Sequence, residues 1–107
     1  MKYFVSYTTR DNEVSEVLLT KVANKLNKIG EVFIDIIDND SIDKQARVID
    51  ELDNSDSLIL ILSSKVYESE WVLFELKRAE ENNNPIIKIS IAQLNNHDDI
   101  GSIIDRQ

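Results

Sequence analysis

The 107-residue sequence contains no cysteine, which excludes disulfide bonds, thiolate metal sites and cysteine nucleophiles. Its only two glycines, Gly30 and Gly101, cannot form the glycine-rich turn of a hydride-transferring dinucleotide fold or the loop of a P-loop nucleotidase. The single histidine, His97, lies in an Asn/Asp-rich stretch and has no second histidine with which to bind a metal. We therefore expect no metal site, and we expect His97 to be a solvated loop residue.

Basic residues are also scarce, because 12 Lys and Arg are set against 20 Asp and Glu, for a net charge of −8. Nucleic acids and anionic membranes both attract basic surfaces, so we expect neither as a partner. The apolar runs are too short to cross a bilayer, and the N-terminus lacks the pattern of a signal peptide. The sequence therefore predicts a cytoplasmic protein of one globular domain.

Four short apolar segments have the composition of β-strands: residues 3–7, 31–36, 58–62 and 85–91. Residues 58–62 are aliphatic throughout, which is typical of a central parallel strand covered on both sides. Helical segments separate the strands, so right-handed parallel crossovers are expected. The sequence predicts an α/β fold: a flavodoxin-like doubly wound parallel sheet of four or five strands, in the order 2-1-3-4, with helices on both faces.

The helices between these strands are predicted from their caps and their apolar periodicity. Asp11, Ser41 and Ser69 are the expected N-caps, and Gly30 is expected to close the first helix. The residues expected to face inward are Val14, Val17, Leu18, Val22, Leu26 and Ile29, then Ile42, Ala46, Ile49 and Leu52, then Val72, Leu76 and Ala79. A short fourth helix is expected around Ile100, Ile103 and Ile104.

The carboxyl ends of parallel strands meet at one edge of a sheet, where open α/β folds bind ligands. This edge is expected to gather residues 6–10, Asp35, residues 38–41, Ser63 and Ser90. Trp71 and Glu75 join them, because residues four apart share one face of a helix. Carboxylates, hydroxyls, an aromatic wall and a cation suit a polyhydroxylated, partly anionic ligand such as a nucleotide or a sugar.

Two more ordinary interpretations compete with this one. Glu75 is four residues from Trp71 but also three from Arg78, with which it can form a surface ion pair, and Trp71 can serve helix packing alone. A response-regulator receiver has the same layout, but it needs acidic residues after the first strand and an aspartate ending the third. This chain has Tyr7-Thr8 and Ser63 there, so the receiver interpretation fails.

Three motifs stand out along residues 2–91: Phe4-Val5-Ser6-Tyr7 with Asp11, Val32-Phe33-Ile34-Asp35, and Ser63 followed by Tyr67, Ser69, Trp71 and Glu75-Leu76. In these motifs the chain resembles a TIR (Toll/interleukin-1 receptor) domain of the bacterial type. The loop at residues 38–41 departs from the pattern, since it lacks the usual glycine. The chain also ends where a fifth strand and a last helix are expected, so we predict a single TIR-like domain over residues 1–107 with that part shortened or missing.

The resemblance implies two functions. Many bacterial TIR domains cleave NAD at the nicotinamide–ribose bond, some of them in antiphage defence, and the glutamate at the position of Glu75 is then the essential catalytic residue. We therefore expect an NAD glycohydrolase or ADP-ribose cyclase with NAD as substrate and no cofactor. The alternative is a non-catalytic module that binds other TIR domains or further copies of itself, and a third hypothesis is a sensor that binds a nucleotide without turnover.

Residue roles follow from the same resemblance. The expected substrate-binding residues are Tyr7, Thr8, Arg10, Phe33, Asp35, Ser63 and Trp71. The expected interaction loop consists of Asp38, Asn39, Asp40 and Ser41. A physical reason supports Glu75, because loss of nicotinamide leaves positive charge on the ribose, which a fixed carboxylate can stabilise. Burial against Trp71 is expected to raise the pKa of Glu75.

Overall fold

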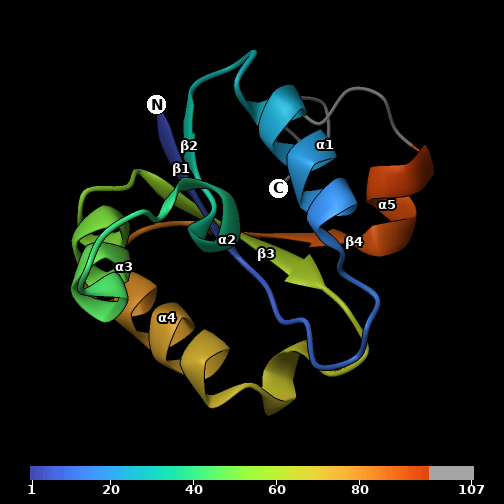
Figure 1. Cartoon of the computed structure of the whole chain (residues 1–107). Helices are drawn as coiled ribbons and strands as arrows, with labels where there is room; N and C mark the ends of the chain where they lie inside the picture. Colours follow the sequence, from blue (N-terminus) through green and yellow to red (C-terminus); the bar gives the residue numbers. More distant parts are fainter. Residues whose placement is uncertain (97–107) are drawn as a thin grey trace.

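The computed structural model describes residues 1–96, whose four parallel strands form one sheet (Figure 1). The strands are β1 (Lys2–Ser6), β2 (Glu31–Phe33), β3 (Ser57–Leu62) and β4 (Ile86–Ser90). Their order is β2-β1-β3-β4, and Phe4 of β1 pairs with Phe33 on one side and Leu58 on the other. The predicted fold class and strand order are confirmed. The open question of a fifth strand and the predicted helix around Ile100 fall outside the described residues.

Helices cover both faces of the sheet, as predicted. They are α1 (Glu16–Leu26), α2 (Asp35–Asp38), α3 (Lys44–Asp53), the short 3-10 helix η1 (Val66–Glu68), α4 (Glu70–Glu81) and α5 (Ile91–Asn96). Figure 1 shows α1 and α5 on one side of the sheet and α3 and α4 on the other. Alternate residues of β3 supply both layers, since Ile59 and Ile61 pack in the first and Leu58 and Leu60 in the second.

The second strand is shorter than predicted. The sequence predicted a strand over residues 31–36, but β2 ends at Phe33 and the chain turns into α2. The carboxylate of Asp38 explains this, because its Oδ2 accepts the Ile34 N–H at 2.8 Å while the Asp38 N–H bonds the Ile34 carbonyl at 2.8 Å. A local side-chain bond of this kind competes with the strand ladder. Asp35 consequently begins a helix instead of ending a strand.

The first helix begins later than predicted. Asp11 is not its cap, since the Ser15 Oγ accepts the Leu18 N–H at 3.1 Å and α1 starts at Glu16. Asp11 instead accepts the N–H of Lys65 at 2.8 Å, which ties two loops together. The predicted stripe was also too wide, because Val17 is 69% exposed and Ile29 is 41% exposed. The i,i+4 series of Val14, Leu18, Val22 and Leu26 is buried as predicted.

Gly30 does not serve as the predicted helix cap. The C-cap of α1 is Asn27, and the backbone of Gly30 is not left-handed. A Cβ at Gly30 would lie 2.3 Å from the Met1 carbonyl oxygen, which accepts the neighbouring Glu31 N–H at 2.8 Å. Gly30 is therefore needed for the close approach of two backbones at the start of β2.

The cap predicted for the second helix was also wrong. Asp43, not Ser41, caps α3, since its Oδ1 accepts the Ala46 N–H at 3.1 Å. The buried face of α3 is formed by Val48 and Leu52, so of the four residues predicted to face inward only Leu52 is buried. Ile42 precedes the helix and is fully exposed, Ala46 is exposed, and Ile49 is half-buried.

The fourth strand ends at Ser90, one residue before the predicted end. Ser90 and Gln93 form a reciprocal capping box: the Ser90 Oγ accepts the Gln93 N–H at 3.1 Å, and the Gln93 Oε1 accepts the Ser90 N–H at 2.9 Å. This box starts α5 at Ile91, a helix that the periodicity did not predict. Within residues 1–96 no helix has the length and apolar composition to cross a membrane.

Candidate functional site

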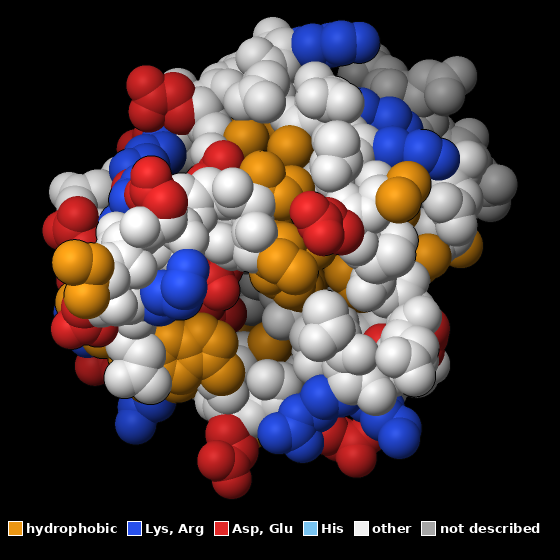
Figure 2. All heavy atoms as spheres, viewed as in Figure 1, with side chains coloured by type: hydrophobic (Ala, Val, Ile, Leu, Met, Phe, Trp, Pro, Cys, Tyr) orange, Lys and Arg blue, Asp and Glu red, His pale blue; other side chains and the backbone are white. Residues whose placement is uncertain are grey.

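A cavity of about 240 Å³ opens at the carboxyl end of β1, between the segment that follows β1, the start of α2 and the start of α4. Figure 2 views this face and shows a hollow beside the hydrophobic side chains near its centre. The cavity is lined by Val5, Tyr7, Thr8, Thr9, Arg10, Asp35, Ser69, Trp71 and Glu75. It therefore combines two carboxylates, four hydroxyls, one cation and two aromatic rings.

Glu75 is the most deeply buried charged residue of this cavity, with 4% of its surface exposed. Its Oε1 accepts a hydrogen bond from the Ser6 Oγ at 2.9 Å, so the last residue of β1 fixes the carboxyl group of α4. The alternative of a surface ion pair with Arg78 is wrong, because Arg78 bonds both carboxylate oxygens of Asp53 at 2.6 and 2.7 Å.

The local sequence explains how α4 presents this carboxyl group. The Ser69 Oγ accepts the Val72 N–H at 3.3 Å, which confirms the predicted N-cap and starts the helix at Glu70. Val72 and Ala79 are buried under the sheet and Leu76 is half-buried. This stripe orients α4 so that Glu75, beside it on the helix, points at the end of β1.

Burial raises the pKa of Glu75 to about 8; the Ser6 hydrogen bond opposes this rise, and the charge of Asp35 adds to it. This rise in the pKa of Glu75 agrees with the prediction from the sequence. At neutral pH the free protein therefore holds Glu75 mainly in its protonated form. A cation placed in the cavity favours release of that proton, so the group is poised to ionise when a positive charge is bound or formed.

The aromatic residues of the cavity have different environments. Tyr7 is half-buried, its hydroxyl accepts the Ile36 N–H at 3.2 Å, and burial raises its pKa to about 12. It therefore remains protonated and can donate to a ligand. Trp71 is 37% exposed and stacks on Phe74, with ring centroids 5.0 Å apart. The indole is thus a wall residue and not part of the core, and its surface suits a flat apolar ring.

The segment after β1 provides the cavity's hydroxyls and its cation. Thr8 is buried, and its Oγ1 accepts the Arg10 N–H at 3.3 Å. The Asn12 N–H bonds the Thr9 carbonyl at 3.2 Å, and Asn12 has a left-handed backbone with φ of 61°. This tight turn, held to Lys65 by Asp11, presents Arg10 at the cavity rim.

Six of the predicted site residues line the cavity together, namely Tyr7, Thr8, Arg10, Asp35, Trp71 and Glu75. Phe33 does not, because it is 2% exposed and stacks on Phe4 in the core with centroids 5.6 Å apart. Ser63 lies elsewhere, since its hydroxyl is beside Asp11 and holds the pKa of that carboxyl below its usual range. Side chains alternate between the two faces of a strand, and this alternation directs Phe33 toward α3, so the prediction that Phe33 binds the substrate at this cavity was wrong.

Three lining residues were not among those predicted to bind substrate: Val5, Thr9 and Ser69. Thr9 lies between Thr8 and Arg10, which were both predicted to bind substrate. Ser69 was predicted only as the cap of the helix that holds Trp71 and Glu75. The place of each residue in the sequence could therefore have predicted that it lies near the site. No group of three or more His, Asp or Glu side chains within residues 1–96 is arranged to hold a metal ion.

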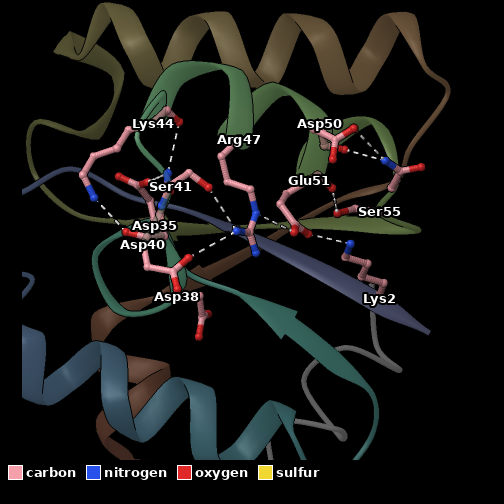
Figure 3. A network of polar contacts seen from close by, with 12 residues as sticks. Lys2, Asp35, Asp38, Asp40, Ser41, Lys44, Arg47, Asp50, Glu51 and Ser55 are labelled. Atoms are coloured by element: carbon pink, nitrogen blue, oxygen red, sulfur yellow. Dashed lines mark hydrogen bonds and ion pairs between the residues drawn. The ribbon is translucent and has the colours of Figure 1, made fainter.

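The predicted interaction loop is anchored to α3 by Arg47 (Figure 3). The Arg47 Nη1 lies 3.6 Å from the Asp40 Oδ1 and donates to the Ser41 Oγ at 3.3 Å. The Arg47 Nε lies 2.8 Å from the Glu51 Oε1. Glu51 also pairs with Lys2 of β1. Asp38 and Asp40 are exposed, Ser41 is partly exposed, and Asn39 is buried. The loop is thus a structured segment with one of its four residues turned inward.

The fold and the cavity define an α/β protein with a carboxyl–aromatic site at the carboxyl edge of its sheet. The model of the TIR domain family matches residues 4–105, so the chain belongs to the TIR domain family. Its fold is similar to that of the TIR domains of the activated Roq1 resistosome, which directly recognises the pathogen effector XopQ, with a TM-score of 0.63 and 16% identity. That match covers 83% of this chain and 56% of the other, so the chain spans little more than half of that relative. No curated protein matches the sequence.

Proposed function

We propose that this TIR domain cleaves NAD at the nicotinamide–ribose bond and that Glu75 is its catalytic residue. One observation carries the proposal: a carboxyl group with 4% exposure faces a cavity lined by an aromatic wall, hydroxyls and one cation. The resemblance to NAD-cleaving TIR domains adds support, because Glu75 and Trp71 stand at matching positions of the motif.

The chemistry requires a site that tolerates positive charge on a sugar. When the glycosidic bond breaks, its electron pair goes to the nicotinamide nitrogen, and positive charge forms on C1′ and the ring oxygen of the ribose. A carboxylate held in a poorly hydrated cavity stabilises that charge without reorganising. Glu75 is held by Ser6, so its position is fixed before the substrate binds.

The raised pKa of Glu75 fits this sequence of events. NAD carries a cationic pyridinium, and its entry favours ionisation of a carboxyl group whose pKa is about 8. Water or a second nucleophile then adds to C1′ and gives up a proton, which the Glu75 carboxylate can accept. One residue thereby serves both charge stabilisation and proton transfer.

The other lining residues suggest how the dinucleotide is oriented. Among the lining residues in the described chain, Arg10 is the only cation, and it suits the diphosphate. Trp71 offers a face to the nicotinamide, and Asp35 can accept hydrogen bonds from ribose hydroxyls. In a chain with a net charge of −8, this local cation compensates for the repulsion of an anionic substrate.

The test is release of nicotinamide from NAD by purified protein, at high protein concentration and with a crowding agent, because assembly can be required. Glu75→Ala should abolish release. Glu70→Ala is the matched control, since Glu70 lies on the same helix and is exposed. Absence of release by the unaltered protein under these conditions, with any cognate activator present, would refute the proposal.

A second candidate is a TIR–TIR interaction module. The supporting observation is the exposure of three apolar side chains on α2 and the loop after it, since Ile36, Ile37 and Ile42 are 50%, 40% and 106% exposed. The similarity to the TIR domains of a resistosome is consistent with assembly. Light scattering should then show association that Glu75→Ala preserves and that Ile36→Lys with Ile42→Lys abolishes. Saturable binding of NAD without product would instead indicate a nucleotide sensor.

A further inference from the structure

Asn39 was predicted to contact a partner, yet only 8% of its surface is exposed and its side chain is fully engaged inside the molecule. Its Nδ2 donates to the Asp35 Oδ1 at 2.7 Å and to the Lys44 carbonyl at 3.0 Å. Its Oδ1 accepts the Ser41 N–H at 3.1 Å. One side-chain amide thus joins the cavity residue Asp35 to Ser41 in the following loop and to Lys44 at the start of α3.

The exposed Lys44 side chain also bonds Asn39. Its Nζ donates to the Asn39 carbonyl at 2.7 Å, and Figure 3 shows Lys44 reaching across the loop toward the α2 side. Asn39 is therefore held by its backbone and by its side chain. Rearrangement of residues 39–44 must break bonds that also hold Asp35.

The position of Asp35 matters to the site because this residue lines two adjoining hollows. One is the cavity with Glu75, and the other, also about 240 Å³, is lined by Asp35, Lys44, Gln45, Val48 and Trp71. Asp35 is half-buried at the first position of a one-turn helix, where an unbound carboxylate has several rotamers open to it. The bond from Asn39 selects one of them.

We infer that Asn39 is a positioning residue, which fixes the Asp35 carboxylate at the rim of the cavity and so couples the conformation of residues 39–44 to the site. The kinetic consequence rests on the proposed NAD cleavage, whereas the structural coupling does not. A partner that contacts the exposed Ile42 of this segment would thereby alter the position of Asp35 through the buried side-chain amide of Asn39.

The chain supplies a matched control in Asn54. Like Asn39, it follows a helix and donates its Nδ2 to the aspartate four residues earlier, in this case the Asp50 Oδ1 at 3.3 Å and the Asp50 carbonyl at 2.8 Å. Neither Asn54 nor Asp50 lines the cavity. Asn54→Ala therefore removes a similar local bond without touching the site.

The first experiment is a double-mutant cycle on kcat/KM for NAD. Asn39→Ala should lower kcat/KM about 10-fold, the effect of one lost hydrogen bond to a charged group. In an Asp35→Asn background the same substitution should change kcat/KM less than 2-fold, because the group through which it acts is already altered. An equal loss in both backgrounds would overturn the inference, since it would indicate a merely structural role.

The second experiment needs no activity. The carboxyl carbon of Glu75 is titrated by NMR, and the charged or titratable groups that share its cavity are Asp35 from α2 and Tyr7 and Arg10 from the chain after β1. The charge of Asp35 raises the pKa of Glu75. Asp35→Asn removes that charge and Asn39→Ala releases it from its position at the cavity, so both substitutions should lower the pKa of Glu75. Asn54→Ala should leave this pKa unchanged. An unchanged titration in Asn39→Ala would overturn the inference.

The two proposals fail in distinguishable ways. Loss of the proposed function appears as absent NAD cleavage in the unaltered protein, and the titration then still tests the role of Asn39. If Asn39→Ala does not fold, Asn39→Ser provides the same test, because serine is tolerated in turns but its hydroxyl is too short to reach Asp35.

Discussion

Replacing Glu75 by glutamine should make the protein more stable at neutral and alkaline pH. Glutamine keeps the size of the protonated side chain and an oxygen that accepts the Ser6 hydroxyl, but it cannot ionise. In the native protein burial raises the pKa of Glu75 from 4.5 to about 8. The folded state consequently binds more protons than the unfolded state between these two values. The contribution of Glu75 to stability is fully present below pH 4.5 and is lost as the pH rises through 8.

The size of the effect follows from the shift. At 1.36 kcal/mol per pKa unit, the full shift corresponds to about 5 kcal/mol, of which about 3 to 4 kcal/mol is lost between pH 5 and pH 8. The carboxyl groups with lowered pKa values, Asp11, Glu51 and Asp53, act in the opposite sense. They are largely ionised in both states above pH 5, so they contribute little slope in this interval.

The assay is urea unfolding at pH 5, 6, 7 and 8, followed by far-UV circular dichroism and by the fluorescence of Trp71, the only tryptophan. The free energy of unfolding of the unaltered protein should fall across this series, and that of Glu75→Gln should stay nearly level. The two proteins should be almost equally stable at pH 5, and at pH 8 the variant should be more stable by about 3 kcal/mol. Glu70→Gln, on the exposed side of α4, is the control and should follow the unaltered protein.

Parallel stability profiles for the unaltered protein and Glu75→Gln would refute this reasoning, because they would mean that Glu75 ionises in the folded state as easily as in water. The expected result has a functional meaning as well. Glu75 would then lower the stability of the protein at neutral pH, whereas its neutral replacement would not. A residue that lowers stability in this way is typical of a site that is retained for function.

Three further predictions concern the site and the fold. Arg10→Ala should raise KM for NAD about 10-fold while leaving cleavage of nicotinamide riboside, which lacks the diphosphate, within about 2-fold; equal loss on both substrates would contradict the role of Arg10. The kcat/KM for NAD should rise with pH up to about 8, because the free protein must lose the proton of Glu75, and a level profile from pH 6 to 9 would contradict a carboxylate role. Gly30→Ala should destabilise the protein by about 2 kcal/mol in thermal or urea unfolding, since its Cβ would meet the Met1 carbonyl oxygen 2.3 Å away; unchanged stability would show that the backbone yields there.

Local patterns in the sequence determined much of the fold. The aliphatic run at residues 58–62 predicted the central strand, and β3 (Ser57–Leu62) is buried between two helical layers. Ser69 predicted the start of α4, and the spacing of Trp71 and Glu75 predicted that both would face one site, which the cavity lining confirms. These features depend on neighbours within a few residues, which is why a single sequence contains them.

The tertiary structure decided what depends on distant contacts. The hydrogen bond from Ser6 to Glu75 joins residues 69 positions apart, and burial by the surrounding elements sets the pKa of the carboxyl group. Phe33 was assigned to the site by its place in the chain, but strand alternation turns it into the core. Asn39 was assigned to a surface loop, yet packing of that loop against α3 buries its amide. The sequence by itself determined which residues reach the edge of the sheet; only packing determined which of them face the cavity, because burial is a property of all the elements together.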